Sequence, residues 1–193
     1  MRLMVAIAVN VKREDEMKFD YVIVGGGSAG SVLASRLTEN PNTTVCLLEA
    51  GGEGKHILIR MPAGLVIMMP GYGHISNWAF DTVPQPGLNG RKGYQPRGKA
   101  LGGSSAINGM LYVRGHRDDY DSWAEQGCDG WNWETCLPYF RKAENHEDGA
   151  GDFHGGDGPL QVSHQKTPRP IVDAFIEAGT QHQIPHVLSL IHI

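Results

Sequence analysis

Cysteine, basic charge and long apolar runs are all scarce in this chain of 193 residues. The three cysteines are an odd number and include no CxxC pair, which indicates reduced thiols in a cytoplasmic setting. Aspartate and glutamate number 21 against 17 lysines and arginines, so no basic field is available to collect nucleic acid. The apolar run at residues 1–9 is far too short to span a bilayer. The remaining composition is typical of a globular domain with its own core.

The sequence also lacks a recognisable metal-binding pattern. His182 and His186 lie four residues apart, but Pro185 between them interrupts any shared helical face. Residues 148–158 contain three aspartates and a histidine, yet they lack the alternating acids closed by glutamate that bind calcium. We therefore predict no metal site, and we interpret residues 148–158 as a turn.

The most informative stretch of the chain is residues 19–49, which alternates between strand, turn and helix patterns. An apolar strand pattern at residues 21–24 is followed by a GxGxxG turn made by Gly25, Gly27 and Gly30. An apolar helical pattern then runs up to Leu37, and a second strand pattern at residues 43–48 ends at Glu49. Strand, glycine turn, helix, strand and terminal acid in this order are typical of a dinucleotide-binding domain. We therefore predict an α/β fold of the Rossmann-like type.

Each residue of this motif has a physical role in holding a dinucleotide. Gly25 permits the tight turn, Gly27 lets the backbone approach a pyrophosphate, and Gly30 lets helix and strand pack closely. The helix N-terminus carries a partial charge of roughly +0.5 and directs N–H groups at the phosphates. A carboxylate at Glu49 can accept hydrogen bonds from both ribose hydroxyls, which argues against NADP. The motif does not distinguish FAD from NAD, because both cofactors contain the same ADP half. The alternative interpretation is a glycine turn with no ligand.

A second glycine-rich loop lies at residues 96–115. The small residues at 102–106 leave room for a phosphate or a flat ring close to the backbone, and Arg97 and Lys99 supply positive charge nearby. A second such loop in one nucleotide domain suits a large, extended cofactor. A flexible Gly/Ser linker is the alternative, although the apolar run at residues 110–113 argues against it.

The rest of the chain gives weaker patterns. The apolar residues 56–69 favour core over a short helix under a cofactor, and residues 84–98 predict an irregular surface excursion. The remaining expected features are an aromatic cluster at 77–80, helices at 118–123, 131–142 (with Asn132 as a candidate N-cap) and 170–179, and a strand at 159–163.

Several of these segments together resemble one enzyme family. Residues 98–108 (GKALGGSSAIN), with Tyr112, Gly115 and Asp121, resemble the signature of the GMC (glucose-methanol-choline) flavoprotein oxidoreductases. The opening GGGSAG and the later LEAG are similar to the start of their FAD-binding domain. The likeness extends over about residues 19–184 and is strongest to the branch that holds choline dehydrogenase and bacterial dehydrogenases of aliphatic alcohols.

The resemblance implies a Rossmann-like FAD-binding domain of the GMC type, incomplete here and followed by the start of a substrate domain. It implies two groups of cofactor-binding residues. The ADP half of FAD would be held by Gly25, Gly27, Ser28, Gly30, Glu49 and Ala50, and the pyrophosphate and flavin would lie along Ala100, Gly103, Ser104, Asn108, Gly109, Met110 and Leu111. Some relatives attach flavin covalently through a histidine just before the motif asparagine. Because that position is Ile107 here, we expect noncovalent FAD.

The activity implied by the resemblance is oxidation of a primary alcohol, choline or an aliphatic alcohol, to the aldehyde by hydride transfer to flavin. A histidine base accepts the hydroxyl proton in this family. No histidine here lies in a matching motif, so we expect the catalytic residues to lie outside this chain. The resemblance implies oxygen or a membrane quinone as the electron acceptor. We expect a cytoplasmic protein, with peripheral contact to the inner membrane as the alternative. The alternatives are a non-catalytic nucleotide-binding fragment, the family's FAD-containing lyases, and an enzyme that uses NAD.

These patterns divide the chain into three parts. We expect residues 1–16 to be a disordered or extraneous N-terminal extension, because the charged run at residues 12–16 separates them from the first strand. Residues 17–185 form the N-terminal part of the FAD-binding domain. Residues 186–193 read as a tail unrelated to the family. Because the resemblance implies a C-terminal part with the catalytic histidines that this chain lacks, we expect the chain to be an N-terminal fragment of a larger enzyme.

Overall fold

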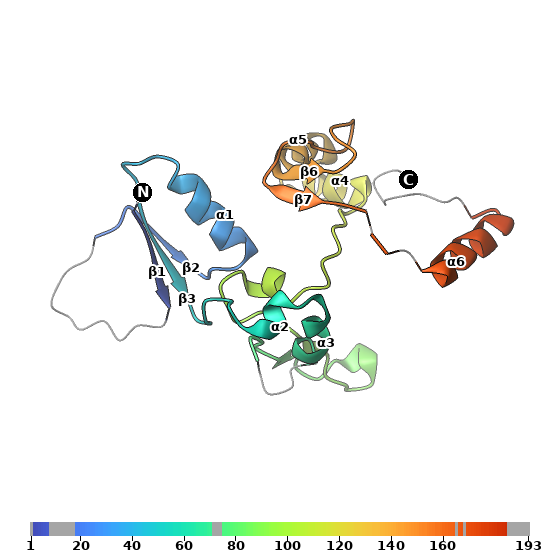
Figure 1. Cartoon of the computed structure of the whole chain (residues 1–193), viewed down its shortest axis with the longest axis horizontal. Coiled ribbons are helices and arrows are strands. Elements are labelled where there is room, and N and C mark those ends of the chain that lie inside the picture. The colour runs from blue at the N-terminus through green and yellow to red at the C-terminus, as the bar shows by residue number, and fades with distance from the viewer. Residues whose placement is uncertain (1, 8–17, 71–74, 165, 168, 185–193) are drawn as a thin grey trace. The chain divides into compact units, whose positions relative to one another are not determined.

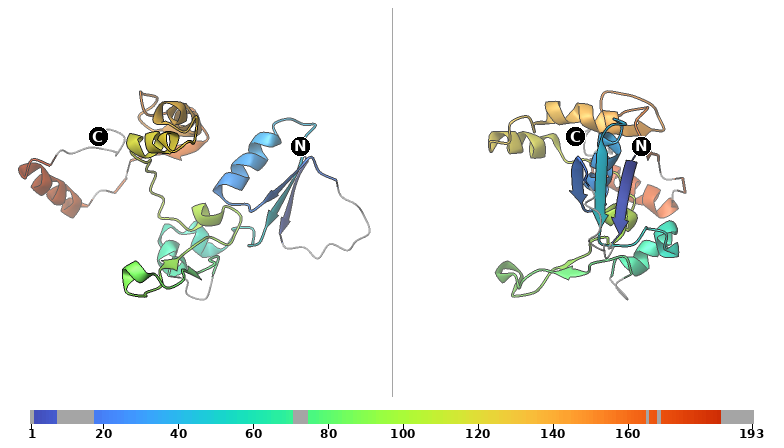
Figure 2. Two further views of the ribbon diagram at one scale, coloured as in Figure 1. Left: turned by 180° about the vertical axis from the view of Figure 1, so that it is seen from behind. Right: turned by 90° about the vertical axis from the view of Figure 1, so that its left-hand side faces the viewer.

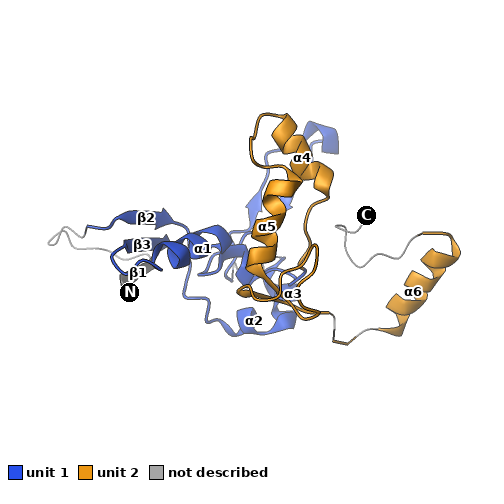
Figure 3. Cartoon of the chain, turned by 90° about the horizontal axis from the view of Figure 1, so that it is seen from above, with its two compact units in different colours: residues 1–111 blue, residues 112–193 orange. Residues whose placement is uncertain are grey.

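A computed structural model describes residues 2–7, 18–70, 75–164, 166–167 and 169–184 (Figure 1). The chain forms two compact units, Met1–Leu111 and Tyr112–Ile193, which are coloured separately in Figure 3. The first unit contains the glycine motif and a parallel sheet. The second contains two packed helices and a short parallel strand pair. No helix in the described ranges is both long enough and apolar enough to cross a membrane.

The first unit is built around three parallel strands. They are β1 (Arg2–Ile7), β2 (Tyr21–Val24) and β3 (Thr44–Glu49), in the order β1-β3-β2. Helix α1 (Ser28–Leu37) connects β2 to β3 and packs on the sheet (Figures 1 and 2). The strand–turn–helix–strand unit predicted from the sequence is therefore confirmed, with boundaries that differ by one residue at β3.

The core of this unit lies between α1 and one face of the sheet. Ala34 of α1 packs against Val45 and Leu47 of β3, and all three side chains are buried. Val45 and Leu47 are two residues apart and therefore share one face of the strand. On β2, Ile23 packs against the same core, whereas Val24 points to the other face and is 84% exposed. This core holds α1 against β2 and β3.

Strand β1 differs from what the sequence predicts. Residues 1–16 were expected to form a disordered or extraneous extension, yet all six residues of β1 pair in parallel with β3, from Arg2 opposite Thr44 to Ile7 opposite Glu49. The segment is largely apolar and contains neither glycine nor proline, which suits a strand of a parallel sheet. The apolar segment is too short to span a membrane, but it is long enough to form a strand. The extraneous origin of residues 1–16 stays a prediction, and residues 8–17 and 185–193 lie outside the described residues.

Short elements follow β3 and carry little core. They are α2 (Ile57–Arg60), η1 (Pro62–Gly64), α3 (Leu65–Met68), the antiparallel pair β4 (Phe80–Asp81) and β5 (Tyr94–Gln95), η3 (Pro86–Leu88), and η4 (Gly103–Ala106). Interpreting residues 56–69 as core was wrong for most of the segment, because Met68 is buried while Val66 is 67% exposed. Pro62 and Gly64 break the run, so its apolar residues do not form one continuous face.

The second unit contains the helices that the sequence predicts. They are α4 (Arg117–Glu125), α5 (Trp133–Ala143) and α6 (Pro170–Gln181), with the parallel strands β6 (Glu144–His146) and β7 (Leu160–Val162). Asn132 is confirmed as the N-cap of α5, because its Oδ1 accepts a hydrogen bond from the Thr135 amide at 3.0 Å. Helices α4 and α5 pack through aromatic rings, with Tyr120 5.4 Å from Trp133 and 5.6 Å from Phe140 between centroids.

A buried ion pair in the second unit joins Arg114, which precedes α4, to Glu144, the first residue of β6. Arg114 donates to Glu144 Oε2 at 2.7 Å, and both side chains are almost completely buried. Burial on its own raises the pKa of Glu144, but hydrogen bonds from the Gly155 amide and His154, together with the Arg114 charge, outweigh it and lower the pKa. Glu144 is therefore a carboxylate that the surrounding residues hold in the charged form.

Candidate functional site

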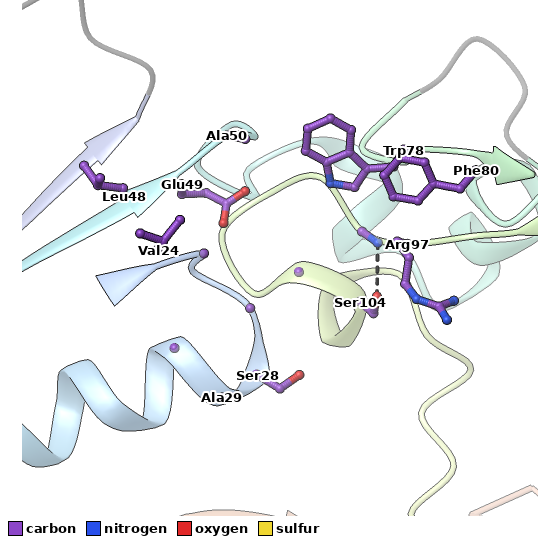
Figure 4. A pocket seen from close by; sticks show the side chains of 15 residues that line it. Val24, Ser28, Ala29, Leu48, Glu49, Ala50, Trp78, Phe80, Arg97 and Ser104 are labelled. Atoms are coloured by element: carbon purple, nitrogen blue, oxygen red, sulfur yellow. Dashed lines mark hydrogen bonds between the residues drawn. The ribbon is translucent and has the colours of Figure 1, made fainter. Parts of the chain in front are cut away.

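An open cavity of about 950 Å³ lies where β2 and β3 end in the first unit (Figure 4). The residues that line it come from the glycine turn, the start of α1, the end of β3 and the loops that follow. They are Val24, Gly25, Gly27, Ser28, Ala29, Gly30, Leu48, Glu49, Ala50, Trp78, Phe80, Arg97, Gly98, Gly103 and Ser104. Ligands of open α/β sheets bind at the carboxyl ends of the strands, which is the position of this cavity.

The glycine turn has the backbone geometry that the motif predicts. Gly25 has a φ of +98°, which side chains rarely allow. A Cβ at Gly30 would lie 1.9 Å from the Gly25 carbonyl oxygen, so only glycine fits between the turn and the helix. Gly27, by contrast, has a φ of −75°, and the nearest atom to its added Cβ would be 3.9 Å away. The space beside Gly27 therefore belongs to the cavity and is not filled by the protein.

Helix α1 begins at this turn without a capping hydrogen bond from a side chain. Gly27 is the N-cap and contributes no side-chain hydrogen bond. The first-turn amides of a helix have no acceptor within the helix. Because Ser28, Ala29 and Gly30 line the cavity, these donors and the positive end of the helix dipole lie at its wall.

Glu49 ends β3 in the cavity wall, and its carboxylate is fixed by backbone donors. Its Oε2 accepts from the Gly26 amide and its Oε1 from the Gly51 amide, both at 2.7 Å. The residue is 8% exposed. A carboxylate has about four lone-pair sites, so two backbone bonds leave acceptor capacity for a further partner. The predicted position of Glu49 beside the glycine turn is therefore observed, and its bonding to ribose stays a prediction.

The second glycine-rich loop packs directly on the first. The Gly102 amide donates to the Gly26 carbonyl at 2.8 Å, and a Cβ at Gly103 would lie 2.7 Å from Gly27 Cα. Ser104 Oγ accepts from the Gly98 amide at 3.1 Å (Figure 4). These contacts make the loop a packed part of the first unit and argue against a flexible linker. Gly103 and Ser104, both predicted from the sequence, reach the cavity.

The other predicted residues do not all gather at this cavity. Ala50 lines it, whereas Ala100 is buried and forms a β-bridge with Gly52. Asn108 and Met110 line a separate cavity of about 90 Å³ beside α2 and α3. Gly109 and Leu111 line neither of these two cavities. The structure therefore unites the residues predicted for the ADP half with Gly103 and Ser104, and leaves residues 108–111 apart from them.

The cavity wall also contains three residues that were not among those predicted to bind the cofactor: Trp78, Phe80 and Arg97. The Trp78 and Phe80 rings stack at 5.6 Å with an interplanar angle of 10° in the cavity wall (Figure 4). Buried Asn77 holds this wall, because its Oδ1 accepts from the Arg97 amide at 3.0 Å. The aromatic cluster and the positive charge were both visible in the sequence. The sequence did not show that these residues lie together, because their proximity depends on the Asn77–Arg97 hydrogen bond between residues twenty positions apart.

Comparison with known proteins identifies the family. Residues 19–189 match the profile of the GMC oxidoreductases, and the chain belongs to this family. The resemblance noted in the sequence and the predicted fold class are thereby confirmed. An oxygen-dependent choline dehydrogenase from Vibrio vulnificus is 51% identical over 172 residues, which are 88% of this chain and 30% of that protein. One from Escherichia coli strain UMN026 is 51% identical over 178 residues, which are 90% of this chain and 32% of that protein.

Solved structures of related proteins agree with the fold. Pyridoxine 4-oxidase from Mesorbium loti is 40% identical with a TM-score of 0.77, over 85% of this chain and 32% of that chain. A formate oxidase from Aspergillus oryzae is 33% identical with a TM-score of 0.77, over 90% of this chain and 32% of that chain. The chain thus spans about a third of the length of the relatives that it matches.

Proposed function

We propose that this chain is the FAD-binding part of a flavin-dependent oxidoreductase that oxidises choline or an aliphatic primary alcohol to the aldehyde. The observation that carries the proposal is the cavity at the ends of β2 and β3, bounded by two glycine loops in contact at Gly27 and Gly103. The choline substrate is supported by the name of the 51% identical relatives, oxygen-dependent choline dehydrogenase. The same name supports oxygen as an electron acceptor, with a quinone as the alternative. A cytoplasmic location stays a prediction.

The residues around the cavity fit the ADP half of FAD. The open space beside Gly27 accommodates a pyrophosphate that a Cβ would displace, and the first turn of α1 supplies amide donors to it. Glu49, fixed by two backbone amides, is available as the acceptor for ribose hydroxyls. The stacked Trp78 and Phe80 rings give the opposite wall an apolar surface.

The chemistry of the reaction comes from the flavin, which when bound accepts two electrons from the alcohol as a hydride. This chain's residues bind and orient that group. Ile107 is 3% exposed, and its hydrocarbon side chain offers no atom for a covalent bond to flavin. We therefore propose noncovalent binding. None of the described residues that line the cavity is a histidine, and we assign no catalytic base to this chain.

Competition between nucleotides tests the binding proposal. FAD is titrated into the chain and followed by its fluorescence, and ADP and FMN are then added as competitors. Because the cavity is built for the ADP half, we expect ADP to displace FAD and FMN, which lacks that half, to leave it bound. Displacement by FMN but not by ADP would contradict the assignment. If NAD binds more tightly than FAD, the flavin proposal fails and the NAD alternative stands.

The reaction is tested in the complete enzyme that contains this segment. Choline or an aliphatic alcohol is added without oxygen, and the visible absorbance of the flavin is recorded. Bleaching is the expected result, since the alcohol reduces the flavin. Aldehyde release from a substrate with the flavin left oxidised would instead identify a lyase of the same family.

A further inference from the structure

Histidines and carboxylates from distant parts of the chain gather at one end of the strand pair β6–β7 in the second unit. His146 is the last residue of β6 and lies opposite Val162, the last residue of β7. Asp148 follows β6 by two residues, and His164 follows β7 by two residues. Because the strands are parallel, their carboxyl ends meet at the same edge, which brings the three polar side chains together.

Backbone hydrogen bonds fix this arrangement. The Glu147 amide donates to the Val162 carbonyl at 3.0 Å, and the Glu147 carboxylate accepts from the His164 amide. The Asp148 amide donates to His146 Nδ1 at 3.3 Å, a hydrogen bond that a metal ion bound at this nitrogen would replace. Glu147, in the loop after β6, is thus hydrogen-bonded both to the end of β7 and to the loop that follows β7.

The side-chain atoms lie close enough to share one ion. Asp148 Oδ2 is 2.6 Å from His164 Nε2 and 3.7 Å from His146 Nδ1. One ligand atom from each of the three residues lies within 4.8 Å of the other two. A tetrahedral ion bonded at about 2.0–2.1 Å would hold its ligands roughly 3.3 Å apart. These two separations lie on either side of that value, so binding one ion would require the side chains to shift and His146 Nδ1 to give up its hydrogen bond from the Asp148 amide.

A second layer of residues supports the ring of His146. The ring of His154 lies 4.4 Å from it between centroids, and His154 Nδ1 is 3.1 Å from both carboxylate oxygens of Glu144. Glu144 is itself held by the buried ion pair with Arg114 and by the Gly155 amide. These contacts hold the His154 ring in the place where the His146 ring packs against it.

We propose that His146, Asp148 and His164 bind a divalent transition-metal ion of the zinc type. Two imidazoles and one carboxylate form a donor set that suits Zn²⁺, whereas Ca²⁺ and Mg²⁺ prefer oxygen ligands alone. Three protein ligands leave the fourth position of a tetrahedral ion to water. The sequence predicted no metal site, because the two histidines lie eighteen residues apart and only the β6–β7 pairing unites them.

Titration of the metal-free chain with Co²⁺, followed by displacement with Zn²⁺, tests this proposal. We expect one Co²⁺ per chain with the intense visible bands of a tetrahedral site, which Zn²⁺ then abolishes. His164→Asn and Asp148→Asn should each weaken Zn²⁺ binding at least about tenfold, since a lost outer-shell partner alone costs 10–100-fold. Both side chains are more than half exposed, so the variants are expected to fold, and circular dichroism checks this.

The control is a chain with His182→Asn and His186→Asn, a histidine pair whose shared helical face Pro185 interrupts. Unchanged Zn²⁺ binding by this control, together with weakened binding by the two cluster variants, supports the proposal. Three results would overturn it: Co²⁺ spectra typical of an octahedral ion, equal Zn²⁺ affinity in wild type and cluster variants, or competition by Mg²⁺ at concentrations similar to Zn²⁺.

Discussion

The cavity of the first unit and the histidine cluster of the second unit are assembled in opposite ways. The cavity is made mainly by segments whose spacing in the sequence is fixed, with Gly25, Gly27 and Gly30 in one turn and Glu49 at the end of the next strand. The cluster is made by His146 and His164, which meet only because β6 and β7 pair. A site held by backbone spacing is visible in a sequence, and a site held by strand pairing is not.

The buried charges behind the cluster provide the largest expected effect. Glu144→Gln leaves the Arg114 guanidinium buried without a counter-charge, and breaking a buried pair in this way costs about 3–5 kcal/mol. Chemical denaturation of the second unit measures the loss. The matched control is Glu39→Gln, which breaks the exposed Arg36–Glu39 pair and should cost less than about 1 kcal/mol. Equal losses in the two variants would show that burial does not distinguish the pairs.

Gly30→Ala should disrupt the glycine turn itself. Its Cβ would lie 1.9 Å from the Gly25 carbonyl oxygen, a backbone atom that cannot move without opening the turn. We expect a loss of about 1–3 kcal/mol in the free energy of unfolding, together with loss of FAD binding. Gly179→Ala in α6 is the control, because no described atom outside its own helix backbone lies within 4 Å of its added Cβ. This control should be neutral or stabilise the helix by about 0.5–1 kcal/mol.

Gly27→Ala sharpens the comparison, because it separates binding from folding. The backbone at Gly27 suits alanine, and the added methyl group would meet no protein atom closer than 3.9 Å. We expect unfolding at the same denaturant concentration as wild type and FAD binding at least about tenfold weaker, which is about 1.4 kcal/mol. Isothermal titration with FAD and a denaturation curve supply the two readings. Normal affinity in this variant would mean that the cofactor does not approach Gly27.

The predictable parts of the molecule are those that local sequence controls. The β2–α1–β3 unit, the N-cap at Asn132 and helices α4, α5 and α6 follow from periodicity and capping chemistry within a few residues. Strand β1 did not, because an edge strand needs only a partner, and that partner, β3, begins 37 residues after β1 ends. Residues that meet through long-range contacts, such as Trp78 and Arg97 around Asn77, were noted singly but not united.

A pH effect of smaller size is expected at the start of the sheet. The Thr44 amide and then the Thr44 hydroxyl donate to Asp20, each at 2.7 Å, and lower the pKa of this exposed carboxyl group from its usual 3.8. Because the folded pKa is lower than the unfolded one, the stabilisation is full above the unfolded pKa. It is lost as the pH falls through the folded pKa.

Asp20→Asn removes this pH-dependent contribution. The difference in unfolding free energy between wild type and variant should therefore shrink as the pH falls from neutral to below the usual pKa of Asp20. Denaturation curves recorded at several pH values measure it. A difference that stays constant over this range would show that the Thr44 hydrogen bonds do not favour the ionised form.

Hydrogen–deuterium exchange of the chain with and without ADP tests the central claim most directly, because it reports where a nucleotide binds. We predict that ADP slows exchange at the amides of residues 25–30 and 98–104, and leaves residues 108–111 and the β6–β7 strand pair unchanged. Protection confined to the second unit, or no protection at the glycine turn at saturating ADP, would contradict the assignment of the cavity to the ADP half of FAD.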